Sequence, residues 1–289
     1  MSIDVLQNKI RKLKNPLLLT LAPRPELIPE KLRREQDSLG KCYGVYCREL
    51  LEGLKDLVPG IRVSFDAFAL QGVDGLVSLG DVLGTAKELG YYVVLDWMHL
   101  EDPGLSQQAA ECIVKQESWP CDALALSVWA GSDCVKPYIA AAGDKKKDIY
   151  VCVKTGNKSG TELQDLQTGG RVVYTAAGDL VSRWGEGMLE RCGYSRVAAV
   201  AGAVNAVSLR TLREKYHRVF LMVEGLETSG ANAKNCSYAF DRMGHGAVCC
   251  AGASVLGAWQ EDGTQDHLAA AREAVERHKR NLSRYVTVL

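Results

Sequence analysis

The chain has 289 residues, and its 35 lysines and arginines balance 35 aspartates and glutamates, so the formal net charge is zero. A neutral chain has no long-range field to attract nucleic acid or an anionic membrane, and we expect neither as a partner. The length alone allows two average domains or one large barrel. The opening segment MSIDVLQNKIRKLKN lacks the apolar core of a secretory signal, and no run of about eighteen apolar residues follows, so we expect a cytoplasmic protein.

Short apolar runs recur along the chain, with amphipathic stretches between them. They lie at 16–22, 61–69, 91–96, 123–128, 148–155, 196–203, 218–225 and 246–253. Continuous apolar runs of this length are typical of parallel strands covered on both faces, and stretches such as GLVSLGDVLGTAKELG have helical periodicity. The pattern predicts a single (β/α)8 TIM barrel over residues 1–289, with a doubly wound open sheet as the alternative.

Ten cysteines are scattered along the chain. Neither the spacing of Cys42 and Cys47 nor the adjacent pair Cys249 and Cys250 fits a zinc site or a CxxC redox motif. We interpret most of the cysteines as small apolar core residues.

Four segments carry a more specific pattern. DIYVCVKTGNKSGTELQDLQ and VAAVAGA with LRTLREKYHRVFLMVEG lie in the second half, GSDCVKPY follows the fourth apolar run, and NPLLLTLAPRPELIPE opens the first. In this order, over about residues 15–259, they resemble the orotidine 5'-monophosphate decarboxylase family, specifically its longer bacterial subfamily. That subfamily has a helical insert after the first strand, here at about 26–58.

The resemblance implies a homodimer with the pocket near the subunit interface, a pyrimidine nucleotide or other small phosphate ligand, and no cofactor or metal. The family's reaction removes carbon dioxide from the pyrimidine C6, and a lysine ammonium stabilises and protonates the resulting carbanion. Two lysines and two aspartates form the charged array, one aspartate coming from the partner subunit. Such preorganised charge is usually the largest contribution to catalysis.

The family's third strand ends Asp-x-Lys-x-x-Asp-Ile-Gly-x-Thr, and the matching stretch here is DWMHLEDPGLS. Asp96 fits the first aspartate, and Met98 falls on the lysine, where a thioether has no charge and no proton to give. An insertion before His99 would put His99 there instead, which needs a bulge at the strand end. We favour Met98.

The rest of this motif fits with one inserted residue. Asp102 is then the second aspartate and Ser106 replaces the threonine, whereas without an insertion Glu101 takes the carboxylate position. The alternative interpretation of Asp96 and Asp102 is structural, as a strand-end cap and a turn residue.

The other positions that the resemblance assigns to substrate are also altered. The second lysine aligns with Arg62, which keeps the charge but has a wider planar group. The aspartate that holds substrate aligns with Ala22, and the serine that reads the pyrimidine aligns with Gly156, between Thr155 and Asn157.

The implied phosphate site has lost its polar side chains. Glu224, Glu227 and Ser229 replace a proline, a glycine and the phosphate-binding glutamine, and Ala253 replaces the arginine. Gly225, Gly230 and Gly252 remain and can offer backbone N–H groups. The alternative is that Glu224 and Glu227 point to solvent or pair with a basic neighbour.

Three hypotheses follow from these substitutions. The first is a family member with weak or no decarboxylase activity, retained as a binding or assembly partner. The second is an active decarboxylase with a rearranged charge set of Arg62, Asp96, His99 and Asp102, with Lys154 as an extra cation. The third is a metal-dependent enzyme, with a divalent ion held by Asp96, Glu224 and Glu227 near His99.

Overall fold

The computed structural model describes residues 2–227, 231–262 and 266–289. Eight parallel strands close into a barrel in the order β1-β10-β9-β8-β5-β4-β3-β2. The open-sheet alternative is wrong, because β1 pairs with both β2 and β10. The prediction of a (β/α)8 barrel is confirmed. The strands are β1 (Leu17–Leu21), β2 (Gly60–Ser64), β3 (Tyr92–Asp96), β4 (Ala123–Ser127), β5 (Asp148–Lys154), β8 (Ser195–Gly202), β9 (Val219–Glu224) and β10 (Ala247–Ala251).

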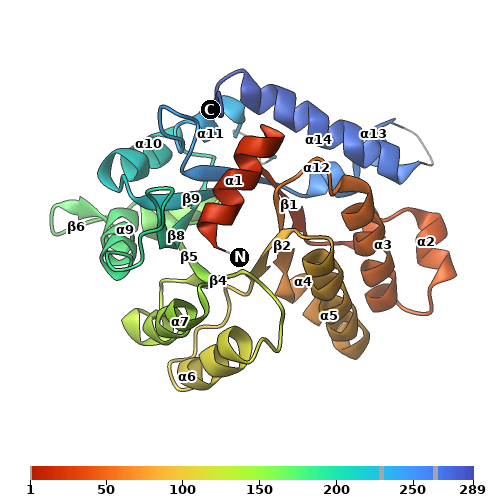
Figure 1. The fold of residues 1–289 in the computed structure, drawn as a ribbon, viewed down its shortest axis with the longest axis horizontal. Helices are drawn as coiled ribbons and strands as arrows, with labels where there is room; N and C mark the ends of the chain where they lie inside the picture. Colours follow the sequence, from red (N-terminus) through yellow and green to blue (C-terminus); the bar gives the residue numbers. More distant parts are fainter. Residues whose placement is uncertain (1, 228–230, 263–265) are drawn as a thin grey trace.

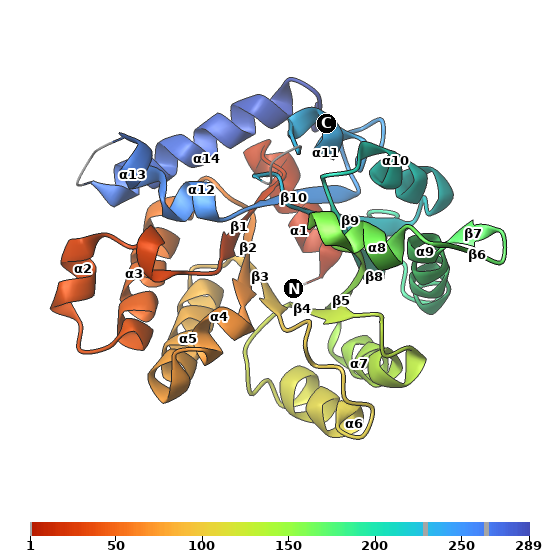
Figure 2. The same ribbon diagram turned by 180° about the vertical axis from the view of Figure 1, so that it is seen from behind.

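Helices surround the barrel on its outside (Figures 1 and 2). Both faces of the strands are therefore covered, and every residue of β4 and β5 is buried. This two-sided burial explains why the strands read as uninterrupted apolar runs. The helices are α1 (Ile3–Leu13), α2 (Glu30–Glu35), α3 (Leu39–Leu54), α4 (Phe65–Ala69), α5 (Gly72–Glu88), α6 (Ser106–Ala109), α7 (Ser132–Lys145), α8 (Thr161–Gln164), α9 (Val173–Trp184), α10 (Ala206–Lys215), α11 (Ala233–Ser237), α12 (Ala253–Leu256), α13 (Ala258–Asp262) and α14 (His267–Ser283).

Helix α1 closes the amino-terminal end of the barrel. The backbone N–H of Gly246, directly before β10, donates to Gln7 Oε1 over 3.2 Å, and the N–H of Cys192, before β8, donates to Asp4 Oδ1 over 2.8 Å. The opposite end, where the strands finish, is left for a site. The segment expected as a helical insert contains α2 and α3, and Trp259 Nε1 anchors it by donating to the Leu27 carbonyl over 2.8 Å.

Two sequence expectations need correction in detail. The strand expected at 61–69 ends at Ser64, because the Ser64 hydroxyl accepts a hydrogen bond from the Ala67 N–H and thereby caps α4. A two-stranded hairpin of β6 (Gln167–Thr168) and β7 (Arg171–Val172) was not expected.

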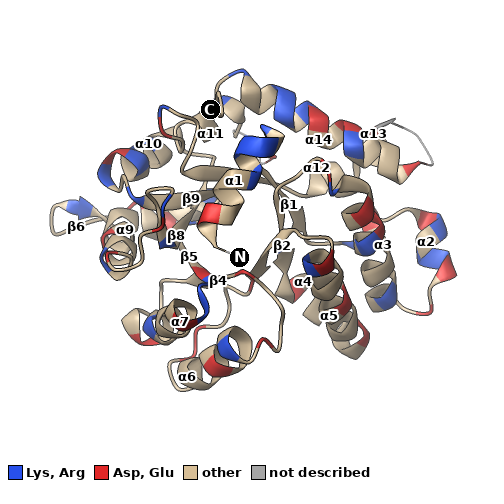
Figure 3. Cartoon of the chain, viewed as in Figure 1, with Lys and Arg blue, Asp and Glu red and all other residues tan. Residues whose placement is uncertain are grey.

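The structure shows where the cysteines and the charged residues lie. All ten cysteines are free, and most are buried, as expected for core residues. Acidic and basic residues intermingle over the helices, with both signs along α14 (Figure 3). Among the described residues, the structure contains no helix with the length and apolar character that crossing a bilayer requires.

Candidate active site

A cavity of about 830 Å³ opens where the barrel strands end. Its volume is typical of sites that bind small molecules. Many residues that the sequence singles out lie in its lining: Ala22, Arg62, Asp96, Thr155, Gly156, Asn157, Glu224, Gly225, Glu227, Gly252 and Ala253. The carboxyl ends of the strands thus bring together residues that are far apart in the chain, as in other barrels of this type.

Arg62 joins two carboxylates on the floor of the cavity. Its Nη2 lies 2.6 Å from Asp96 Oδ2, at the end of the neighbouring strand β3, and its Nη1 forms an ion pair with Glu224 Oε1, at the end of β9. The side chains are only 10%, 15% and 18% exposed for Arg62, Asp96 and Glu224. The planar guanidinium can bind both carboxylates at once through different nitrogens. A lysine ammonium has a single nitrogen and fixes the direction of its partners less strictly.

Burial and charge act against each other in this cluster. Burial disfavours the charged form of Arg62, but Glu224 and Asp96 outweigh it and raise the pKa of the guanidinium. Burial raises the pKa of Asp96 above its usual range, with Glu224 adding to the effect and Arg62 opposing it. Arg62 therefore stays protonated at every physiological pH and cannot act as an acid.

Two polar atoms in this cluster have no partner. Asp96 Oδ1 and Arg62 Nε are buried without a hydrogen bond, whereas Thr20 contacts the Cys250 thiol. Asp96 and Arg62 both line the cavity. Buried polar groups are normally hydrogen-bonded, so these two atoms indicate where a ligand would bind.

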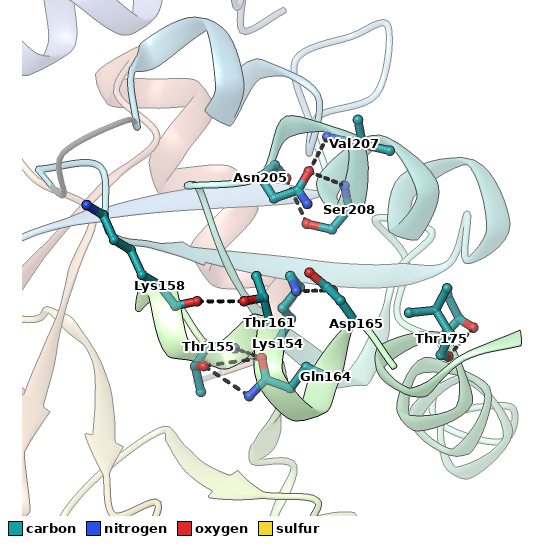
Figure 4. A network of polar contacts seen from close by, with 11 residues as sticks. Lys154, Thr155, Lys158, Thr161, Gln164, Asp165, Thr175, Asn205, Val207 and Ser208 are labelled. Atoms are coloured by element: carbon teal, nitrogen blue, oxygen red, sulfur yellow. Dashed lines mark hydrogen bonds and ion pairs between the residues drawn. The ribbon is translucent and has the colours of Figure 1, made fainter. Parts of the chain in front are cut away.

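The loop after β5 forms one wall of the cavity. The Thr155 N–H donates to Gln164 Oε1 over 3.0 Å, and Gln164 Nε2 donates to Thr155 Oγ1 over 3.0 Å (Figure 4). These bonds hold Gly156 against Gly202, where an added Cβ on Gly202 would lie 2.4 Å from Gly156 Cα. The close approach explains why position 202 is glycine, whereas a Cβ on Gly156 would come no nearer than 3.7 Å to another atom.

Lys154 does not serve the cavity, so its expected role as an extra cation is wrong. Its ammonium forms an ion pair with Asp165 (Figure 4) and lies 5.1 Å from the centre of the Tyr174 ring. Because these partners lie outside the cavity lining, Lys154 links β5 to the helices outside the barrel.

The metal hypothesis is also not supported. Among the described residues, no group of three or more His, Cys, Asp and Glu side chains is arranged to hold an ion. Instead, the guanidinium of Arg62 lies between Asp96 and Glu224. A cation of the protein itself therefore occupies the place where a divalent ion would have to sit.

Sequence comparison decides the family. The chain is 31% identical over 238 residues to the orotidine 5'-phosphate decarboxylase of Rhodopirellula baltica, a match that covers 79% of each protein. The chain belongs to the orotidine 5'-phosphate decarboxylase family. The enzyme of the same name from Clostridium novyi is 23% identical over 288 residues, or 98% of each protein. No family model matches the sequence.

Solved structures of this family share the fold. The Leishmania donovani OMP decarboxylase superposes with a TM-score of 0.73 at 21% identity, covering 96% of this chain and 99% of that one. The Plasmodium berghei orotidine 5'-monophosphate decarboxylase gives 0.78 at 11% identity and 98% coverage of both. At such identities the likeness concerns the barrel and not the chemistry.

The turn after β3 places neither Met98 nor His99 in the cavity lining. The strand keeps a regular register to Asp96 without a bulge, and Trp97 then stacks on Phe65 with ring centres 3.6 Å apart. His99 is 81% exposed, and its Nδ1 lies 2.6 Å from Asp66 Oδ2. The option of an inward-facing His99 is therefore wrong, because the bulge that it needs is missing.

The second half of this motif forms a turn. Asp102 is exposed, and its side chain accepts a hydrogen bond from the Gly104 N–H over 2.8 Å. Buried Ser106 donates to the Asp102 carbonyl over 2.8 Å, and Glu101, like these two, is absent from the cavity lining. Within one chain, Asp102 therefore stabilises a turn, as the structural alternative for this residue predicted. Asp96, in contrast, lines the cavity.

At the implied phosphate site, Gly225, Gly252 and Ala253 line the cavity, and Gly225 has a positive φ of 75°. Glu227 turns toward this wall and accepts hydrogen bonds from backbone N–H groups after β10. Ser229 and Gly230 lie outside the described residues. Glu224 and Glu227 thus both line the cavity; Glu224 pairs with Arg62, and Glu227 Oε1 lies 4.0 Å from His278 Nε2, outside the lining.

Sequence reasoning missed other residues in the lining, including Thr20, Tyr43, Gln71 and Cys250. Thr20 and Cys250 lie within apolar runs, so their polar atoms give no signal of their own. Tyr43 comes from α3 and Gln71 from the turn before α5, and only the folded arrangement brings them to the strand ends.

Proposed function

We propose that this member of the orotidine 5'-phosphate decarboxylase family has weak or no decarboxylase activity and has kept the barrel as a binding scaffold for a small ligand. The observation that carries the proposal is the buried cluster in which Arg62 is shared between Asp96 and Glu224. Among the described residues that line the cavity, the cations are Arg24 and Arg62, so it has no lysine ammonium.

The chemistry of decarboxylation makes this substitution severe. Loss of carbon dioxide leaves a carbanion, which needs a nearby positive charge and then a proton. Arg62 holds its proton too strongly to donate it, and two carboxylates already neutralise its charge. A preorganised charge that is directed at other groups gives little stabilisation to a new anion.

The rearranged-charge alternative has less support. It requires Arg62, Asp96, His99 and Asp102 to act together, but His99 bonds to Asp66 at the surface and Asp102 caps a turn. Only Arg62 and Asp96 of this set lie in the cavity.

Turnover of orotidine 5'-monophosphate by the purified protein tests the proposal directly. We expect formation of uridine 5'-monophosphate at least about a thousandfold slower than with the Rhodopirellula baltica relative assayed in parallel, since losing one stabilising group costs about a hundredfold to a thousandfold and several positions are altered here. Met98→Lys alone should not restore the rate, because the pyrimidine and phosphate contacts are also altered. A rate near that of the relative, or substantial turnover from Met98→Lys, contradicts the proposal.

We further propose that two chains form a homodimer with the cavities near the interface. Leu70, Val73 and Val77 are 82%, 77% and 60% exposed, and Leu70 lines the cavity mouth. Adjacent exposed apolar side chains often mark an interaction surface. Light scattering should give twice the 31.5 kDa mass of one chain. Replacing Val73 and Val77 with lysine should shift the mass toward that of one chain; a monomeric wild-type protein would contradict this.

A further inference from the structure

Glu227 lies at the edge of the cavity, and its carboxylate is held by the residues that follow β10. The backbone N–H groups of Gly252, Ala253 and Ser254 donate to it over 3.0, 3.1 and 2.9 Å. The Ser254 hydroxyl donates a fourth hydrogen bond. Four donors that converge on one carboxylate form an anion-binding site, which a side chain of the same protein occupies here.

A second residue holds the Ser254 donor in place. Ser254 Oγ lies 2.6 Å from Nε2 of His278 on α14. Because the hydroxyl proton points to Glu227, Nε2 of His278 must carry the proton and donate to Ser254. Burial lowers the pKa of His278, with the nearby Glu227 opposing it, which suits a neutral imidazole in this role. His278 is outside the cavity lining, so the Ser254 hydroxyl is positioned by a residue that no ligand in the cavity would displace.

The other charges of the cavity do not favour an anion. Arg62 is paired with two carboxylates, and Arg24 lies 3.4 Å from Glu26, with both side chains more than half exposed. On the floor, the unpartnered Asp96 Oδ1 can accept a hydrogen bond and the unpartnered Arg62 Nε can donate one. The floor therefore favours an uncharged ligand that carries both a donor and an acceptor.

Resting on the proposed function, we infer that Glu227 determines the ligand class of this cavity. Its carboxylate occupies the anion site after β10, so the cavity admits uncharged or cationic ligands and excludes phosphate esters. A phosphate group at this site would have to displace the carboxylate from four hydrogen bonds and then lie beside its negative charge.

Inorganic phosphate is the direct probe, with Glu227→Ala as the variant that frees the four donors. By calorimetry we expect no phosphate binding to the wild-type protein and measurable binding to the variant. Uridine and uridine 5'-monophosphate form a matched pair that differs only in the phosphate. The variant should prefer the monophosphate by about tenfold or more, as expected for charge-assisted hydrogen bonds, and the wild-type protein should not.

Glu30→Ala is the matched control, because it removes one acidic charge whose partner, Arg34, lies outside the lining of this cavity. It should behave like the wild-type protein. If Glu227→Ala does not fold, Glu227→Gln keeps the side-chain size, removes the charge and should also gain phosphate binding. A folded Glu227 variant without that gain overturns this inference alone, and equal phosphate affinity in wild type and variant does the same. Turnover of the nucleotide by the wild-type protein refutes the proposed function and, because the nucleotide is a phosphate ester, this inference with it.

Discussion

Replacing Arg62 with alanine is expected to destabilise the protein by about 3–5 kcal/mol, as measured by urea denaturation at neutral pH. The change leaves Asp96 and Glu224 largely buried and without the cation that both contact. Breaking a buried ion cluster by removing one partner costs much more than the cluster contributes relative to neutral residues, because the remaining charges stay desolvated.

The pH dependence of this variant has a definite sign. Without the guanidinium, the pKa of the Asp96 carboxyl, already raised by burial, should rise further. A carboxyl whose pKa is higher in the folded than in the unfolded state binds more protons when folded, so the free energy of unfolding falls as the pH rises through that range. The loss in Arg62→Ala should therefore be smaller at pH 5 than at pH 8.

A neutralised cluster provides the control. Arg62→Met combined with Asp96→Asn and Glu224→Gln removes all three charges together, and most of the lost stability should return. A loss below about 1 kcal/mol in Arg62→Ala, or a loss that grows toward acidic pH, would show that the three groups are not coupled as their contacts indicate.

The barrel could be predicted from the sequence because burial on both faces leaves apolar runs without alternation. ALALSV, for example, contains the whole of β4. Local capping was harder to see: Ser64 ends β2 and starts α4 within a stretch that is apolar on both sides. The hairpin of β6 and β7 did leave a signal in the sequence, the adjacent pair Gly169 and Gly170. Both glycines have a positive φ, as the two-residue turn between the strands requires.

For the site, the sequence predicted which end of the barrel matters but not which side chains meet. Arg62 and Glu224 lie on β2 and β9, which are not neighbours in the sheet, so no spacing in the chain relates them. His99 looked like a replacement proton donor because the position of an inserted residue was undetermined. The stacking of Trp97 on Phe65 and the contact with Asp66 decide its outward direction, and these depend on tertiary packing.

The contacts of Glu227 could not be predicted from the sequence. An acidic residue in a segment that should bind phosphate could face solvent, pair with a base or fill the site itself. Only the convergence of N–H groups from the end of a different strand distinguishes these options. Together with the Arg62 cluster, it means that the charges in this cavity are satisfied largely by one another, which leaves few of them free to act on a substrate.

Gly202→Ala tests whether the cavity wall depends on the close approach of β8 to the loop after β5. An added Cβ would lie 2.4 Å from Gly156 Cα and 2.6 Å from the Thr155 carbonyl oxygen. Both are backbone atoms, so no side chain can rotate away, and we expect a loss of about 3 kcal/mol in the free energy of unfolding. The Thr155–Gln164 hydrogen bonds should weaken as the loop is displaced, which faster amide exchange at Thr155 would reveal.

Gly84→Ala is a matched control for which we expect the opposite change in stability. Gly84 lies within α5, and an added Cβ there meets no atom within 4 Å. Alanine has the higher helix propensity, so this change should stabilise the protein by about 0.5–1 kcal/mol. If Gly202→Ala were as well tolerated as Gly84→Ala, the loop after β5 would have to move away from the added Cβ at little cost. The hydrogen bonds between Thr155 and Gln164 oppose this movement, because they fix the backbone that the Cβ would meet.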